Sequence, residues 1–246
     1  MKHAEVAGGR IRWVELPGAQ PARVYLHGLG NSSLVAFGQV AAHPALVGRR
    51  SLLIDMLGYG ISDRPASFGY SLREHADSIA VALDRGGVCG TEVVAHSMGG
   101  AVAIVLATVR PDLVSRLVVA EANLDPTERP RIAGYTEDEF ATHGFAKALA
   151  NVDPEWAATM RLADPVALYR SEVALGRGAT PRVREMLIGL DMPKTFLLGA
   201  RSGELEGRTE LEASGVRVIT VPDAGHTMMF DNPDGFATAL FGALRG

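Results

Sequence analysis

The chain has 246 residues, of which 47% are hydrophobic, and its formal net charge is −4. This length suits one globular domain, or one domain with an inserted subdomain. The sequence has no basic run, so nucleic-acid binding has no electrostatic support. It also has no stretch of about 18 apolar residues and no N-terminal apolar segment, so we expect neither a membrane span nor a signal peptide.

The single cysteine, Cys89, excludes a disulfide within the chain and suits a reducing, cytoplasmic location. It lies among glycines before an expected strand, and we expect a partly buried structural thiol. No metal-ligand cluster stands out, so we expect no metal and no cofactor. The expected partner is a small-molecule substrate, with no nucleic acid and no membrane, and a homodimer is left open.

Short strands and glycine-containing turns dominate the N-terminal part. Strands over 4–7 and 10–16 are expected to flank Gly8-Gly9, which is a hairpin turn signal. Buried strands are expected at 24–26 and 51–55. The sequence therefore predicts a hairpin that leads into a sheet.

A capping box marks the first long helix. Ser71 and Glu74 have the spacing in which a serine hydroxyl and a glutamate carboxylate satisfy each other's backbone N–H groups. The helix should run to about Arg85, where glycines follow. His75 lies on this helix, and we expect it at the surface.

The stretch from Thr91 to Ala107 predicts a strand, a sharp turn and a helix, with Ser97 at the turn. A serine held on a strained turn needs small neighbours, so that the backbone can fold back and the Oγ can stand clear. Gly99 and Gly100 supply them after the serine. The alternative is an ordinary helix N-cap, for which serine is favoured. The strand before Ser97 and the glycines after it favour a nucleophile.

After a strand at 116–120, the character of the chain changes over 122–186, where helical patterns are short and broken by prolines. This segment is interpreted as a helical cap inserted into a core formed by 1–121 and 187–246. Core strands resume at 194–199 and 216–221, and a final helix is expected from Asp234 to about Leu244. The cap's large apolar side chains could line a substrate cavity or attach the cap to the core: Tyr135, Phe140, Phe145, Trp156, Met160 and Tyr169.

Alternating strands and helices predict a mostly parallel sheet with helices on both faces. Four motifs stand along it in order: His27-Gly28-Leu29, the segment 55–62, His96 to Gly100, and Gly225-His226. Over nearly its whole length the chain resembles the α/β-hydrolase superfamily, and in particular carboxylesterase-like serine hydrolases. The resemblance implies an eight-stranded sheet with an inserted helical cap, and ligands in such sheets bind beyond the carboxyl ends of the strands.

The resemblance also implies roles for single residues. Ser97 would be the nucleophile and His226 the general base, and the backbone N–H groups of Leu29 and Met98 would form the oxyanion hole. His27 would hold its loop as a structural residue. The elbow departs from Gly-x-Ser-x-Gly at Ala95, the mildest replacement for the first glycine.

The acid is where the chain departs most from the family, which usually carries aspartate after the seventh strand. This chain has Ser202 at that point, and serine cannot carry negative charge at neutral pH. Glu121, directly after the strand at 116–120, matches the glutamate position of some haloalkane dehalogenases, and a carboxylate at a strand end is costly without a purpose. Glu204 and Asp125 are the alternative acids, and an acid-free dyad or an inactive site is also left open.

Serine with histidine implies acyl transfer through an acyl-enzyme, and hydrolysis of a small carboxylic ester is the first hypothesis. Thioester, lactone or amide hydrolysis would use the same groups. The alternatives are hydrolysis of a carbon–carbon bond in a diketone-like acid, and a non-catalytic small-molecule binding protein. Four cap arginines could bind a substrate carboxylate, although a solvated surface charge is the simpler interpretation of each: Arg129, Arg131, Arg161 and Arg170.

Overall fold

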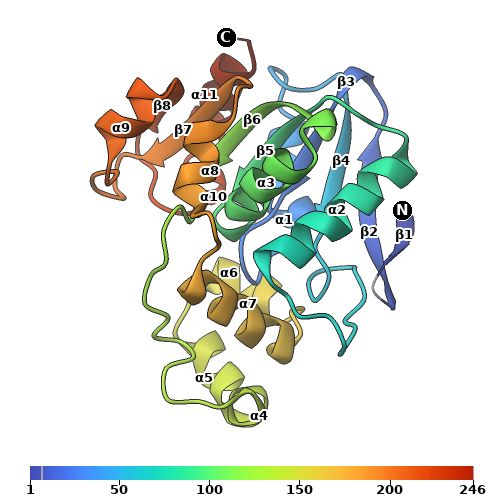
Figure 1. The fold of residues 1–246 in the computed structure, drawn as a ribbon, viewed down its shortest axis with the longest axis vertical. Coiled ribbons are helices and arrows are strands. Elements are labelled where there is room, and N and C mark those ends of the chain that lie inside the picture. Colours follow the sequence, from blue (N-terminus) through green and yellow to red (C-terminus); the bar gives the residue numbers. More distant parts are fainter. Residues whose placement is uncertain (7, 246) are drawn as a thin grey trace.

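A computed structural model describes residues 1–6 and 8–245 and shows a central sheet between two layers of helices (Figure 1). The sheet has eight strands in the order β1-β2-β4-β3-β5-β6-β7-β8. The pairings from β4 through β8 are parallel, and β1 and β2 form an antiparallel edge. The predicted α/β fold with a mostly parallel sheet is confirmed. Its strands are β1 (Lys2–Val6), β2 (Gly9–Leu16), β3 (Ala19–Leu26), β4 (Arg49–Asp55), β5 (Thr91–His96), β6 (Val114–Ala120), β7 (Lys194–Gly199) and β8 (Val216–Val221). Ala7, expected to end the first strand, lies outside the described residues.

The helices lie on both faces of the sheet and beyond one end of it. α2, α3 and α8 cover the face toward the viewer in Figure 1, and α1 and α11 cover the other. The helices are α1 (Ser33–Ala41), α2 (Leu72–Gly86), α3 (Met98–Val109), α4 (Glu137–Glu139), α5 (Phe145–Ala150), α6 (Pro154–Met160), α7 (Pro165–Arg177), α8 (Val183–Gly189), α9 (Arg208–Ala213), α10 (Met228–Asp231) and α11 (Pro233–Arg245).

Two hydrophobic cores follow from the alternation of side chains along each strand. In β5, Val93 and Ala95 pack with the core under α2 and α3, and Val94 packs with the core under α1 and α11. Every residue of β5 is buried, as expected for a parallel strand covered on both faces. The carboxyl end of this strand is therefore fixed from both sides, directly before Ser97.

The capping box of α2 is present, since the Ser71 side chain accepts from Glu74 N–H and the Glu74 carboxylate accepts from Ser71 N–H. The expectation that His75 lies at the surface is wrong. His75 is fully buried against the rings of Tyr59, Phe68 and Tyr70. Burial lowers the pKa of His75 to about 3, so its imidazole is neutral at physiological pH.

Cys89 also departs from expectation. It is exposed in the loop between α2 and β5, and its neighbour Val88 is buried instead. The turn places the thiol outward, so it is not the partly buried structural cysteine that the glycine-rich context suggested.

Helices α4 to α7 gather beyond the sheet, whereas α8 returns to contact α3 (Figure 1). Hydrogen bonds join this segment to the core loops. Asp164 N–H donates to Gly58 C=O at 2.9 Å, and the Tyr59 hydroxyl donates to Ser171 Oγ at 2.8 Å. We propose that 122–186 forms a cap over the core, and the second boundary of this segment falls within α8.

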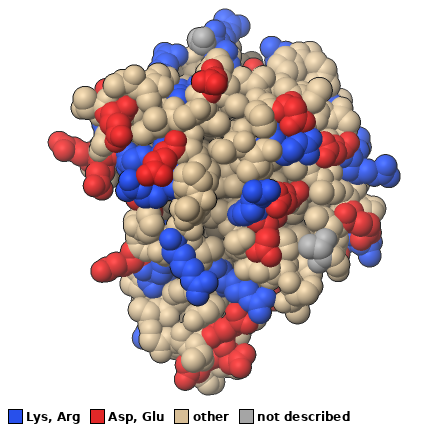
Figure 2. Space-filling model, viewed as in Figure 1, with Lys and Arg blue, Asp and Glu red and all other residues tan. Residues whose placement is uncertain are grey.

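Acidic and basic side chains are mixed over the face shown in Figure 2. Within the described ranges, 1–6 and 8–245, none of the helices has the length and apolar character needed to cross a bilayer.

Candidate active site

Ser97 stands on the turn between β5 and α3 in a strained backbone conformation, with φ 52° and ψ −120°. A non-glycine residue with positive φ is uncommon, and such strain is concentrated at functional sites. The turn is held because Ser97 N–H donates to Ala120 C=O at 2.9 Å. Gly99 has no room for a side chain, since a Cβ there would lie 2.3 Å from the carbonyl oxygen of His27. The small residues of the elbow therefore allow α3 to start against the end of β3.

His226 lies in the loop after β8, and its Nε2 is 3.1 Å from Ser97 Oγ. Its side chain is about half exposed, at 48%. Two contacts hold this loop. His96 Nε2–H donates to the carbonyl of His226 at 2.7 Å, and Gly225 N–H donates to Asp231 Oδ2 at 2.7 Å.

His96 is a buried residue of this site. Burial, and then the nearby His226, lower the pKa of His96 to about 3, so it is a neutral imidazole whose Nε2 carries the proton. The sequence motif from His96 to Gly100 did not by itself give His96 a role. Its position directly before the elbow serine was the available sign that it would lie next to the His226 loop.

Glu121 follows β6 directly and, like Ser97, has a positive φ, 48°. Gly199 N–H, at the end of β7, donates to Glu121 Oε1 at 2.7 Å. The other oxygen, Oε2, lies 3.8 Å from His226 Nδ1, which is an ion-pair distance longer than a hydrogen bond. Burial acts to raise the pKa of Glu121, but His226, Gly199 N–H and Ser202 outweigh it, and the pKa lies below its ordinary value.

The two alternative acids lie in other surroundings. Asp125 accepts from Arg184 Nε at 2.8 Å, and Glu204 is exposed. Among the described residues, Glu121 is the one carboxylate within 4.0 Å of a His226 ring nitrogen. The structure thus brings Ser97, His226 and Glu121 together.

The charge of Glu121 determines which ring nitrogen of His226 carries the proton. An ionised Glu121 can only accept, so the proton of a neutral His226 belongs on Nδ1, which faces it. The Nε2 of His226 then has a lone pair and accepts from the Ser97 hydroxyl. This is the orientation in which a histidine can take the proton of a serine. Asn123, which sequence reasoning missed, also contacts this hydroxyl, with Oδ1 at 3.4 Å.

The loop after β3 lies beside the serine. His27 bridges two backbone groups, because its Nε2 accepts from Met56 N–H at 3.1 Å and its Nδ1 lies 2.7 Å from Gly28 C=O. Burial lowers the pKa of His27, so it is a neutral structural residue. In a trans peptide the N–H points opposite to the C=O, so Leu29 N–H points away from the His27 ring.

Asp55 anchors the loops at the mouth of the site. Its two carboxylate oxygens accept from Ser33 N–H at 2.7 Å and Ile61 N–H at 2.9 Å. The carboxylate thereby joins the loop after β4 to the start of α1.

A cavity of about 180 Å³ opens at the serine. Of the six large apolar cap residues considered as its lining, only Trp156 borders it among the described residues. Tyr135, Phe145 and Tyr169 stack around Phe140 within the cap instead. The cavity lining consists of Gly28, Leu29, Asn31, His96, Ser97, Asn123, Arg129, Arg131, Trp156, Leu175, His226 and Thr227.

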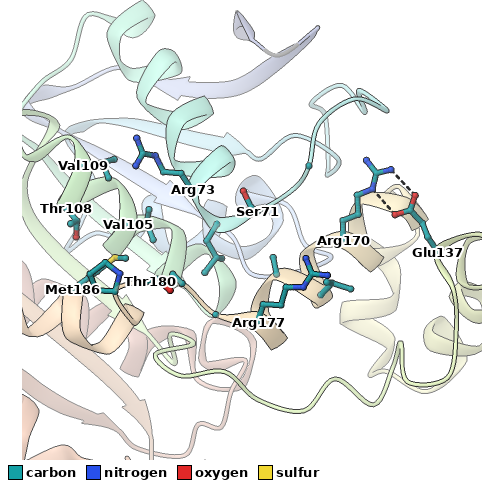
Figure 3. Close-up of a pocket in the computed structure, with 17 residues that line it drawn as sticks. Ser71, Arg73, Val105, Thr108, Val109, Glu137, Arg170, Arg177, Thr180 and Met186 are labelled. Carbon is teal, nitrogen blue, oxygen red and sulfur yellow. Dashed lines mark hydrogen bonds and ion pairs between the residues drawn. The ribbon is translucent and has the colours of Figure 1, made fainter.

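A larger cavity, of about 570 Å³, lies between α2, α3 and α7 (Figure 3). Ser71 and Arg177 border it, and Ser97, Glu121 and His226 do not. This larger cavity is not the candidate active site, because Ser97 on its strained turn and His226 both line the smaller cavity. In the described part of the chain, no group of three or more His, Cys, Asp or Glu side chains is arranged to hold a metal ion.

Comparison with known proteins shows the family to which the chain belongs. The family model described as alpha/beta hydrolase fold matches residues 24–188, and the chain belongs to this family. It is 28% identical to the sn-1-specific diacylglycerol lipase ABHD11 of Mus musculus, over 89% of this chain and 80% of the lipase. It is 34% identical to the 2-hydroxymuconate semialdehyde hydrolase of Pseudomonas putida, over 38% of this chain and 34% of that protein. The enol-lactonase from Burkholderia xenovorans LB400 has the same fold, with a TM-score of 0.83 at 19% identity over the whole of both chains.

Proposed function

We propose that this protein is a serine hydrolase that cleaves a small carboxylic ester, with Ser97, His226 and Glu121 as its catalytic triad. The observation that carries the proposal is the 3.1 Å contact between Ser97 Oγ, on a strained turn, and His226 Nε2. The similarity to a lipase supports ester chemistry.

In the first half-reaction, His226 Nε2 takes the proton of Ser97 Oγ as that oxygen bonds to the ester carbonyl carbon. The charge of Glu121 stabilises the imidazolium. When the tetrahedral intermediate collapses, His226 gives its proton to the leaving alcohol and an acyl group stays on Ser97. Water, deprotonated by His226, then attacks the acyl-enzyme, and the carboxylic acid leaves as Ser97 regains its proton.

The developing oxyanion needs donors that are already in place. We assign the N–H groups of Leu29 and Met98 to this role. Met98 is the first residue of α3, so its N–H is one of the unpaired donors at a helix N-terminus. Leu29 borders the same cavity as Ser97, and a Cβ on Gly28 would lie 3.2 Å from the Cβ of Ser97.

Hydrolysis of a carbon–carbon bond in a diketone-like acid is the second candidate. The presence of Arg129 and Arg131 in the cavity lining favours it, as does the similarity of one segment to a semialdehyde hydrolase. A carbon–carbon bond hydrolase would cleave a substrate that has no ester oxygen. Turnover of an ester and of a diketone-like acid by the same protein therefore distinguishes the two candidates.

The test is turnover of p-nitrophenyl butyrate by the wild-type protein, by Ser97→Ala and by Ser67→Ala, which changes an exposed loop serine. We expect Ser97→Ala to lower kcat by more than about a thousandfold, as loss of a triad serine does, and Ser67→Ala to have no effect. Absence of turnover by wild-type protein that still binds the ester would favour the receptor alternative. Equal activity of Ser97→Ala would overturn the triad.

A further inference from the structure

Two arginines of the segment after β6 reach the cavity that contains Ser97. Arg129 and Arg131 both line it, and its other charged or titratable lining groups are His96, which is neutral, and His226. Among the described residues, no carboxylate lines this cavity. The protein groups that line the cavity next to Ser97 therefore carry a net positive charge.

The arginines share one acid, which lies behind them. Glu172 of α7 is fully buried, and its Oε1 accepts from Arg131 Nη1 at 2.8 Å. Its Oε2 lies 3.6 Å from Arg129 Nη1, beyond hydrogen-bond distance. Two guanidinium groups against one carboxylate leave an excess of one positive charge. Burial acts to raise the pKa of Glu172, and protonation of this acid would increase the excess further.

Arg129 has unused hydrogen-bond donors. Its Nε and Nη2 are buried and have no partner among the described residues, and its side chain is only 14% exposed. Buried polar groups in folded proteins are almost always paired, and an unpaired buried charge is costly. Because Arg129 borders the cavity that contains Ser97, a bound ligand can supply the partner that Arg129 Nε and Nη2 lack.

Arg131 is held in position on both sides. Its guanidinium lies over the Trp156 ring, 4.8 Å from the centroid, and it is bonded to Glu172. Trp156 in turn donates from Nε1 to Leu29 C=O at 2.9 Å. The positive group is thus fixed relative to the loop beside Ser97 before any ligand arrives, and such preorganisation lowers the cost of binding.

We infer that the substrate is an anionic ester, which carries a carboxylate a few bonds from the scissile carbonyl, and that Arg129 and Arg131 bind this carboxylate. This inference rests on the proposed serine hydrolase activity. The size of the cavity, about 180 Å³, suits a short monoester of a dicarboxylic acid. Arginine is well suited to the task because its planar donors match a carboxylate in pairs.

Of the four arginines considered from the sequence, Arg161 and Arg170 do not share this position. Arg170 makes two hydrogen bonds to Glu137, at 2.7 and 2.8 Å, and borders the larger cavity instead (Figure 3). Arg161 is exposed and does not line the cavity at Ser97. It therefore offers a matched control, since Arg161→Gln removes the same charge from the same segment.

The kinetic test compares two ethyl esters, monoethyl succinate and ethyl butyrate, by the ethanol they release; the first carries a carboxylate where the second has its terminal methyl group. We expect wild-type protein to prefer monoethyl succinate in kcat/KM. Arg129→Gln should lower kcat/KM for monoethyl succinate by about tenfold to a hundredfold, the range for loss of charge-assisted hydrogen bonds, and change it less than about threefold for ethyl butyrate. Arg161→Gln should leave both unchanged.

Binding provides a readout that does not depend on turnover. Ser97→Ala protein, titrated calorimetrically, should bind monoethyl succinate more tightly than ethyl butyrate and lose this preference when Arg129→Gln is added. Ser97-dependent hydrolysis with no preference, unchanged by Arg129→Gln, would overturn the anionic-substrate inference and leave the hydrolase proposal standing. No hydrolysis of either ester, with the binding preference intact, would instead overturn the hydrolase proposal. An Arg129→Gln protein that does not fold is replaced by Arg129→Lys, which keeps the charge but loses the paired donors, and should show a partial loss.

Discussion

Gly199 donates its backbone N–H to Glu121 Oε1 at 2.7 Å, and this bond links the ends of β7 and β6. In the family pattern, the loop after β7 carries the acid. Here the last residue of β7 holds an acid that follows β6 and leaves its second oxygen facing His226. In the proposed triad, Glu121 therefore takes the place of an aspartate at position 202, although it lies 81 positions earlier in the sequence.

Replacing Glu121 tests this compensation. In Glu121→Gln the amide oxygen can still accept from Gly199 N–H, so the fold should be kept, but the charge facing His226 is lost. We expect kcat for p-nitrophenyl butyrate to fall by about a hundredfold to ten-thousandfold, the range for amide replacement of a triad acid, with a smaller change in KM.

Glu204→Gln is the matched control for this experiment, because Glu204 is exposed. It should retain full activity. The assignment of the acid is wrong if Glu204→Gln loses activity and Glu121→Gln keeps it. Thermal unfolding of each variant checks that the comparison is made between folded proteins.

His75 predicts a dependence of stability on pH. Its pKa is lowered to about 3 in the folded protein from 6.5, so below pH 6.5 the unfolded chain takes up a proton that the folded protein does not. Stability should therefore fall as the pH drops from 6.5 toward 3, by up to about 1.4 kcal/mol per pH unit from this residue. His75→Leu should remove this part of the slope in urea unfolding measured at pH 7, 6 and 5.

An exposed histidine serves as the control for this slope. His143→Gln should leave the slope as it is in the wild-type protein. His96, also with a pKa of about 3, contributes a slope of the same sign that stays in both variants. If His75→Leu and the wild-type protein lose stability in parallel between pH 7 and 5, burial of a neutral His75 is refuted.

Two glycine-to-alanine substitutions should change the free energy of unfolding in opposite directions. A Cβ at Gly99 would lie 2.3 Å from the carbonyl oxygen of His27, so the start of α3 must move, at a cost of about 1–3 kcal/mol in unfolding free energy, and activity should fall with it. Gly242, inside α11, has nothing within 4 Å of an added Cβ, and alanine there should stabilise by about 0.5–1 kcal/mol. Chemical denaturation gives both values, and a neutral Gly99→Ala would show that the elbow does not need this close approach.

The sheet and the elbow could be predicted because local pattern determines them. A buried strand, a serine and two glycines in succession leave few arrangements of the backbone, and strand order places Glu121 and the His226 loop at the same edge of the sheet. The structure brings these groups together as expected. The role of His96 in holding His226 depends on a contact between residues 130 positions apart, which spacing alone does not reveal.

His75 shows a different kind of error. Leu72, Ala76 and Ile79 recur at helical spacing and define the buried face of α2, and His75 lies on it. The helical spacing of these residues therefore indicates that His75 is buried, although histidine is more often exposed. For Arg129 and Arg131, by contrast, no local pattern could tell a solvated arginine from one that lines a cavity. Their position depends on contacts with Glu172 of α7, which lies 41 residues after Arg131 in the sequence.

The hydrogen bond from Trp156 Nε1 to Leu29 C=O joins α6 to the loop after β3, and both residues border the cavity that contains Ser97. The bond restrains the same residue whose N–H is proposed as an oxyanion donor. Loss of the indole donor would therefore loosen this stretch of backbone without any change to Ser97 or His226. A substitution in α6 can thus act on the proposed oxyanion hole through the main chain alone.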